Sequence, residues 1–144
     1  AETEKRNELI LSYVNKNPKK YSVLLCERLT QVSYLHSKLK QSVMLTSKMT
    51  KKKRAETMEL VKTGKKNIVV STYGLFSTGI DIPALEILYL CSPIKSEIKL
   101  RQSAGRLMRK SPGKTEAKIF DFVDKKVSIL RNAGYHRKRI LNNL

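Results

Sequence analysis

Residues 67–83 read NIVVSTYGLFSTGIDIP, and this stretch decides the fold class. It begins with residues 67–71, whose apolar centre Ile68-Val69-Val70 is typical of a strand buried on both faces of a parallel sheet. We expect the following residues, with two glycines, several hydroxyls and Asp81, to form a loop. Ligands of open parallel sheets bind beyond the carboxyl ends of the strands. Glycines and hydroxyls there suit phosphate contacts, whereas the alternative is an ordinary loop in which Asp81 caps a turn.

Strand and helix patterns alternate on both sides of this stretch. Apolar runs predict further strands over residues 21–26, 42–46, 85–91 and 117–123. Apolar residues at helical spacing predict helices over residues 3–16, 31–40, 51–62 and 96–108. We expect Thr30 and Thr50 to be N-caps, Gly64 to end a helix, and residues 125–144 to be mostly helical. The order predicts a single α/β domain over residues 1–144, with a parallel β-sheet flanked by helices on both faces.

The chain is strongly basic. Its 144 residues include 30 Lys and Arg against 12 Asp and Glu, which gives a formal net charge of +18. Such an excess of positive charge repels itself and favours an anionic partner. Nucleic acid is such a partner, because lysine and arginine side chains that contact its phosphates release bound counterions, which strengthens binding. The alternative is a merely soluble basic surface. We expect no membrane partner, because no apolar run approaches the roughly 20 residues that span a bilayer.

The two cysteines, Cys26 and Cys91, each lie in an apolar, strand-like run. This position predicts buried free thiols, and their number and spacing resemble neither a disulfide framework nor a zinc site. We therefore expect an intracellular protein that is not secreted, with no metal site of its own.

Residues 102–109 read QSAGRLMR and form the sharpest motif of the chain. On a helix, Gln102, Arg106 and Arg109 fall at i, i+4 and i+7, so their polar ends emerge on one face. Two guanidiniums one turn apart make an always-ionised clamp for phosphate oxygens. The alternative is a solvated basic face. It would not explain Gly105, because a glycine within a helix costs about 1 kcal/mol relative to alanine.

Together these motifs resemble motifs IV, V and VI of superfamily 2 helicases, in the same order. The resemblance spans roughly residues 20–125 and implies the RecA-like fold of the C-terminal helicase domain. The strand near the end of the chain resembles the one that closes this domain in XPB-like and phage UvsW-like helicases and their relatives from large DNA viruses. The resemblance rests on Val23–Cys26, Thr46, Ser47, Arg54, Thr72–Pro83, Gln102–Arg109 and Gly113–Asp124.

The resemblance implies a role toward ATP for five residues. Arg109 matches the arginine finger that reaches the γ-phosphate, and Arg106 matches its partner on the phosphates. Gln102 matches the polar residue that links the nucleotide to domain closure. Gly79 and Asp81 match residues near the ribose and the interdomain cleft.

The resemblance also implies contacts with nucleic acid. Thr72 matches a hydroxyl that holds a backbone phosphate, and Thr46 and Arg54 fall where related helicases touch the tracking strand. Many DEAD-box RNA helicases have Thr-Asp where this chain has Thr72-Tyr73, and His where it has Gln102. These departures weaken the likeness to DEAD-box helicases and leave both DNA and RNA open as partners. DNA is favoured by analogy alone.

The sequence has no P-loop, which ATP hydrolysis requires. Gly113-Lys114-Thr115 resembles the end of one, but Met108 replaces the first glycine, and the triplet follows a predicted helix instead of preceding one. We interpret it as a turn. We expect an N-terminal RecA-like domain outside residues 1–144 to hold ATP and Mg²⁺, so this chain alone should not hydrolyse ATP. The alternatives are an ATPase-less nucleic-acid-binding module with a helicase-like fold, and a nucleotide- or partner-binding Rossmann-like domain.

Overall fold

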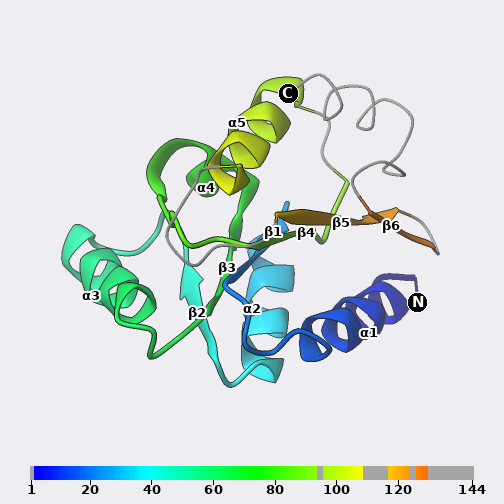
Figure 1. Ribbon diagram of the computed structural model, residues 1–144, viewed down its shortest axis with the longest axis horizontal. Helices are drawn as coiled ribbons and strands as arrows, with labels where there is room; N and C mark the ends of the chain where they lie inside the picture. The colour runs from blue at the N-terminus through cyan, green and yellow to red at the C-terminus, as the bar shows by residue number, and fades with distance from the viewer. Residues whose placement is uncertain (1, 94–95, 109–116, 124–125, 130–144) are drawn as a thin grey trace.

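Six strands form one sheet in the order β2-β3-β1-β4-β5-β6 (Figure 1). The computed structural model describes residues 2–93, 96–108, 117–123 and 126–129. The first five strands are parallel, as predicted, and the sixth pairs antiparallel with the fifth. Their bounds are β1 Ser22–Cys26, β2 Ser42–Leu45, β3 Ile68–Thr72, β4 Ile87–Leu90, β5 Lys118–Val123 and β6 Lys126–Ile129.

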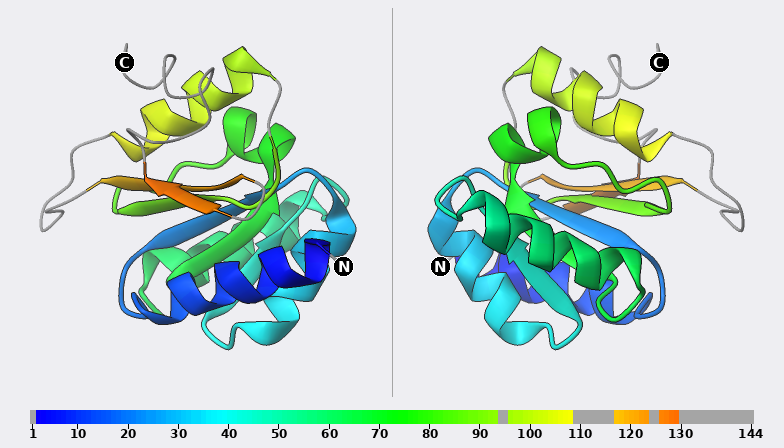
Figure 2. Two further views of the ribbon diagram at one scale, coloured as in Figure 1. Left: turned by 90° about the vertical axis from the view of Figure 1, so that its right-hand side faces the viewer. Right: turned by 90° about the vertical axis from the view of Figure 1, so that its left-hand side faces the viewer.

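Helices cover both faces of the sheet, which confirms the predicted layers. The helices are α1 Glu2–Asn15, α2 Leu29–Lys38, α3 Lys51–Lys62, α4 Tyr73–Gly79 and α5 Glu97–Leu107. Figure 2 shows α1 and α2 on one side of the sheet and α4 and α5 on the other. Helix α3 packs on the same side as α4 and α5, because its Val61 belongs to their core cluster. In the part of the chain that the structure describes, no helix is long and apolar enough to span a membrane.

Successive side chains of each parallel strand pack into cores on opposite faces of the sheet. Val23 and Leu25 of β1 pack toward α3, α4 and α5, whereas Leu24 and Cys26 pack toward α1 and α2. All five residues of β1 are buried, as a strand covered on both faces requires. Cys26 and Cys91 are buried free thiols, as predicted. Burial, and then the neighbouring Cys26 thiol, raise the pKa of the Cys91 thiol well above its usual value.

The predicted ends of α3 are confirmed, whereas the predicted cap of α2 is wrong. The Thr50 hydroxyl accepts a hydrogen bond from the Lys53 N–H at 3.1 Å, and Gly64 follows α3 with φ +80°. Helix α2 begins at Leu29, and its N-cap is Arg28, which makes no side-chain cap hydrogen bond. Because Thr30 lies inside the first turn of α2, its hydroxyl is not at the N-cap position.

The predicted loop after β3 is wrong over its first half, since Tyr73–Gly79 forms helix α4. Thr72 is the N-cap of α4, and its hydroxyl accepts from the Leu75 N–H at 3.4 Å. Tyr73, Phe76 and Ile80 are fully buried against the sheet. Their spacing of three and four residues is helical, and it outweighs the low helix propensity of the two glycines.

A strand also begins where the sequence predicted a helix. Residues Lys126–Ile129 form β6, and Val123 pairs with Lys126 across a two-residue connection. Such short connections are typical of β-hairpins. The rest of the predicted helix over residues 125–144 lies outside the described residues.

Candidate functional site

The sheet order places four strand ends side by side at its carboxyl edge. Strand β2 is followed by Thr46, and β3 ends at Thr72. Leu45 pairs with Ser71, so these two threonines follow neighbouring paired positions. Beyond them along the same edge, Glu27 follows β1 and Ser92 lies two residues past β4. Neighbouring strands are about 4.8 Å apart, so residues from distant parts of the sequence lie close together.

Thr46, Thr72 and Arg54, the predicted nucleic-acid ligands, lie at this edge or on the helix that follows it. Thr46 is buried and Thr72 is half-buried. The Thr72 hydroxyl accepts the cap bond of α4 and keeps its own hydrogen for an external acceptor. Arg54 lies in the first turns of α3, and its Nε is enclosed with no hydrogen-bond partner among the described residues. A bound anion would supply the missing acceptor.

The structure brings Gln102 and Arg106 together on the outer face of α5. The opposite face of α5 buries Leu100, Ser103, Ala104 and Leu107. An open pocket of about 330 Å³ is lined by Gln102, Gly105, Arg106 and Ser77. The Nη2 of Arg106 donates a hydrogen bond to the Ser77 carbonyl at 3.3 Å. Sequence reasoning missed Ser77, because the residues around it were expected to form a loop.

Gly105 opens this pocket. A Cβ built on Gly105 would meet nothing within 4 Å, so interior packing in the described residues does not explain the glycine. Helix α5 ends at Leu107, and Arg109, the predicted finger, lies outside the described residues.

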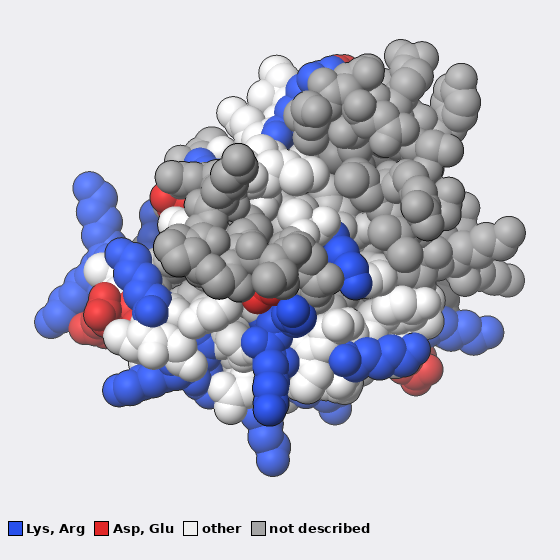
Figure 3. All heavy atoms as spheres, in the orientation of Figure 1, with Lys and Arg blue, Asp and Glu red and all other residues white. Residues whose placement is uncertain are grey.

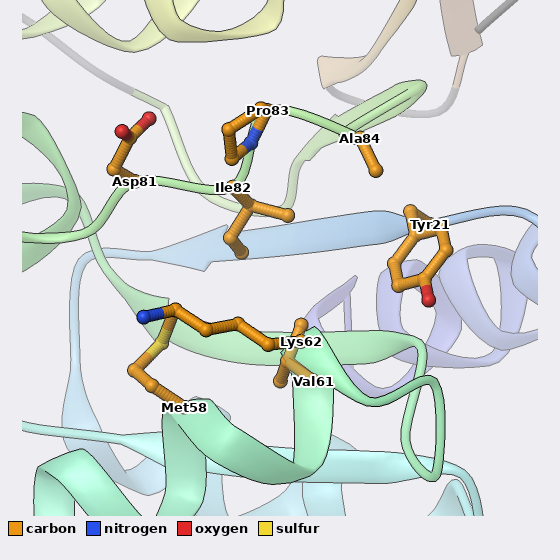
Figure 4. Close-up of a pocket in the computed structure, with 8 residues that line it drawn as sticks. All are labelled: Tyr21, Met58, Val61, Lys62, Asp81, Ile82, Pro83 and Ala84. Carbon is orange, nitrogen blue, oxygen red and sulfur yellow. The ribbon is translucent and has the colours of Figure 1, made fainter. Parts of the chain in front are cut away.

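Gly79 lies at the end of α4, and Asp81 lies in the segment that follows it. Gly79 is the final residue of α4, and Asp81 is exposed. Figure 4 shows Asp81 at the rim of a separate pocket of about 180 Å³, with its carboxylate directed away from α3. Met58, Val61 and Ile82 line this pocket, so it is largely apolar.

Guanidinium and amide donors on α5 suit phosphate oxygens. In the described residues, no group of three or more His, Cys, Asp or Glu could hold a metal ion. Figure 3 shows lysine and arginine side chains over many parts of the visible face, with few acidic ones among them. The donors that the described residues offer on α5 therefore suit contacts to phosphate oxygens.

Comparison with known proteins agrees with this geometry. The helicase conserved C-terminal domain model matches residues 4–111. The chain is 41% identical over 73 residues to the ATP-dependent DNA helicase uvsW of Enterobacteria phage T4, covering 48% of this chain and 14% of that protein.

Solved structures share the fold. The crystal structure of T4 UvsW has a TM-score of 0.66 at 20% identity and covers 96% of this chain and 31% of that one. A DEAD box protein from the hyperthermophile Methanococcus jannaschii has a TM-score of 0.74 at 19% identity, covering 97% of this chain and 36% of that one. The chain thus spans well under half of these proteins. It belongs to the helicase conserved C-terminal domain family and has the RecA-like fold of helicase C-terminal domains.

Proposed function

We propose that this chain works as the C-terminal RecA-like half of an ATP-dependent superfamily 2 helicase or translocase. The observation that carries the proposal is the presence, on one small domain, of two groups of side chains whose chemistry suits phosphate oxygens. Gln102 and Arg106 line an open pocket on α5. Thr46, Thr72 and Arg54 lie at or beside the carboxyl edge of the sheet.

Helix α4 joins the two groups. Thr72 caps its start, and the carbonyl of Ser77 near its end accepts from Arg106. A shift of α4 caused by nucleic acid at Thr72 would therefore move the acceptor that holds Arg106. This contact provides a physical link between strand binding and the nucleotide pocket.

On the nucleotide side, the P-loop of an N-terminal domain would hold ATP and Mg²⁺, and hydrolysis would transfer the γ-phosphoryl group to water and release ADP. Arg106 and Arg109 contribute positive charge to the phosphates, and Gln102 contributes an amide to the same face. Gly79 and Asp81 take the ribose side of the cleft. Arginine fingers of this kind accelerate phosphoryl transfer by about 10³–10⁵-fold.

On the nucleic-acid side, we favour DNA, because the T4 relative is named a DNA helicase. The partner would be held mainly by its backbone, since Thr46, Thr72 and Arg54 are suited to phosphates and not to base edges. We place the activity inside a cell. The decisive experiment measures ATP turnover of the longer protein with duplex DNA, single-stranded DNA and RNA. Turnover that no nucleic acid stimulates would contradict the helicase proposal, and nucleic-acid binding without any turnover would favour an ATPase-less module.

This chain by itself is expected to bind single-stranded DNA with an affinity that falls steeply with salt. Arg54→Gln should weaken binding at low salt and lower the slope of log Kd against log salt by about 0.7, the value for one phosphate contact. Fluorescence anisotropy of a labelled oligonucleotide measures both quantities. Arg101→Gln is the matched control, because Arg101 is exposed and paired with Glu97 at 3.1 Å. Binding that ignores salt would instead favour a Rossmann-like partner domain.

Gly105→Ala is expected to separate stability from activity. Because an added Cβ has free space, alanine should raise the free energy of unfolding by about 0.5–1 kcal/mol. In the longer protein the methyl group would protrude into the pocket beside Arg106 and slow ATP turnover. Chemical denaturation and an ATPase assay measure the two effects. Unchanged turnover in the more stable variant would contradict a close approach at this pocket.

Gly64→Ala is the contrasting control for Gly105→Ala. Gly64 has φ +80°, and its Cβ would lie 3.3 Å from the Tyr21 hydroxyl. A residue with a side chain is strained in that conformation. The free energy of unfolding should therefore fall in Gly64→Ala, whereas it rises in Gly105→Ala.

A further inference from the structure

A second polar pocket lies at the carboxyl edge, beyond the ligands described above. Its volume is about 270 Å³, and it opens where α1 and α2 meet the ends of β1 and β4. None of its residues was singled out by the sequence motifs. The residues that matter are Arg6, Glu27, Arg28, Thr30, Gln31 and Ser92.

A hydrogen-bond network fixes one wall of this pocket. Gln31 Nε2 donates to the Asn7 side-chain oxygen and to the Cys91 carbonyl, each at 3.0 Å. The Ser92 hydroxyl donates to Gln31 Oε1 and accepts from the Glu27 N–H at 3.1 Å. These bonds link α1, α2, the end of β1 and the end of β4, and so hold this wall of the pocket in place.

The two arginines of the pocket, Arg6 and Arg28, have no ion-pair partner in the part of the chain that the structure describes. Arg6 Nε is enclosed and has no hydrogen-bond partner among the described residues. Glu27 is the acid at the rim, and it is exposed. An enclosed N–H without an acceptor is unfavourable, and an anionic ligand would remove that cost.

The pocket is connected to the start of α4. The Tyr73 hydroxyl donates to the Ser92 carbonyl at 2.6 Å, and Tyr73 directly follows Thr72. Strand β1 separates β3 from β4 in the sheet. The ends of β3 and β4 are therefore two strand spacings apart, which is about 10 Å. A strand that touches Thr72 and runs along this edge therefore reaches the pocket.

We propose that Arg6 and Arg28 bind a backbone phosphate of the nucleic-acid strand in this pocket, so that α1 and the end of β4 extend the track. The proposal rests on the proposed function. Two planar guanidiniums match phosphate oxygens in geometry and charge. The Thr30 hydroxyl can donate a further, uncharged hydrogen bond to the phosphate. The N-cap residue of α2, Arg28, makes no side-chain cap hydrogen bond to the first turn of the helix.

Arg6→Gln tests the proposal on this chain. Anisotropy of a labelled single-stranded oligonucleotide is measured across a salt series. We expect about 5- to 20-fold weaker binding at low salt, and a salt slope lower by about 0.7. Arg6→Lys keeps the charge without the planar fork, so it should retain the salt slope and recover part of the affinity. Arg101→Gln is the control for loss of one exposed positive charge, and thermal unfolding shows that each variant is folded.

The outcomes separate this proposal from the proposed function. If Arg54→Gln weakens binding but Arg6→Gln matches the wild type in affinity and slope, the pocket holds no backbone phosphate and the proposal is overturned. That result would point to an acidic side chain as the ligand. If the wild-type chain binds no nucleic acid even at low salt, the proposed function itself fails. Should Arg6→Gln not fold, Arg28→Gln provides the same comparison from α2.

Discussion

Arg109→Ala is expected to lower ATP turnover of the longer protein by about 10³–10⁵-fold, the contribution of an arginine finger to phosphoryl transfer. A guanidinium that stabilises charge on the transferred phosphoryl group acts in the transition state, so its loss should appear in kcat more than in KM. Nucleic-acid affinity should change little, because the proposed contacts to the strand involve Thr46, Arg54 and Thr72 and not this residue. Single-turnover and steady-state ATPase assays, together with anisotropy, measure these quantities.

Two further variants sharpen this test. Arg106→Ala should also slow turnover, and it removes the hydrogen bond to the Ser77 carbonyl at the same time. Arg101→Ala should leave turnover unchanged, since Arg101 is exposed and paired with Glu97 on the same helix. Near wild-type turnover in Arg109→Ala would show that the finger is assigned to the wrong residue.

Phe76→Ala is expected to lower the free energy of unfolding by about 3–5 kcal/mol, the usual cost of truncating a buried aromatic side chain. Phe76 is fully buried on α4, in the core cluster that includes Tyr73 and Ile80. Small domains are stable by only about 5–15 kcal/mol, so the variant should be close to unfolding at physiological temperature. Urea and thermal denaturation provide the measurement.

Phe76→Leu is the control for this prediction, because it keeps most of the apolar volume and should cost much less. The comparison also tests the architecture. If residues 73–79 formed an exposed loop, truncation of Phe76 would change stability by well under 1 kcal/mol. Such a small effect would contradict the packing of α4 against the sheet.

The contrast between α4 and the other helices shows where sequence reasoning was sufficient. Residues 51–62 carry a cap at Thr50 and a stop at Gly64, and both signals are local. Residues 73–79 carry the same helical spacing in Tyr73, Phe76 and Ile80. The two glycines and the neighbouring hydroxyls, however, favour a loop when the segment is considered alone. Burial of three large side chains against the sheet outweighs that local preference.

The sequence by itself determined the five parallel strands, the helices α1, α2, α3 and α5, and the shared face of Gln102 and Arg106. The strands follow from short continuous apolar runs, and the helices and the shared face follow from spacings of three and four residues that helical geometry imposes. Tertiary structure alone decided which strand ends are neighbours, and so placed Thr46 beside Thr72 and Arg6 beside Ser92. It also placed the Ser77 carbonyl against Arg106. These contacts join residues up to about 85 positions apart, and they depend on how the crossovers order the strands and how the helices pack on them.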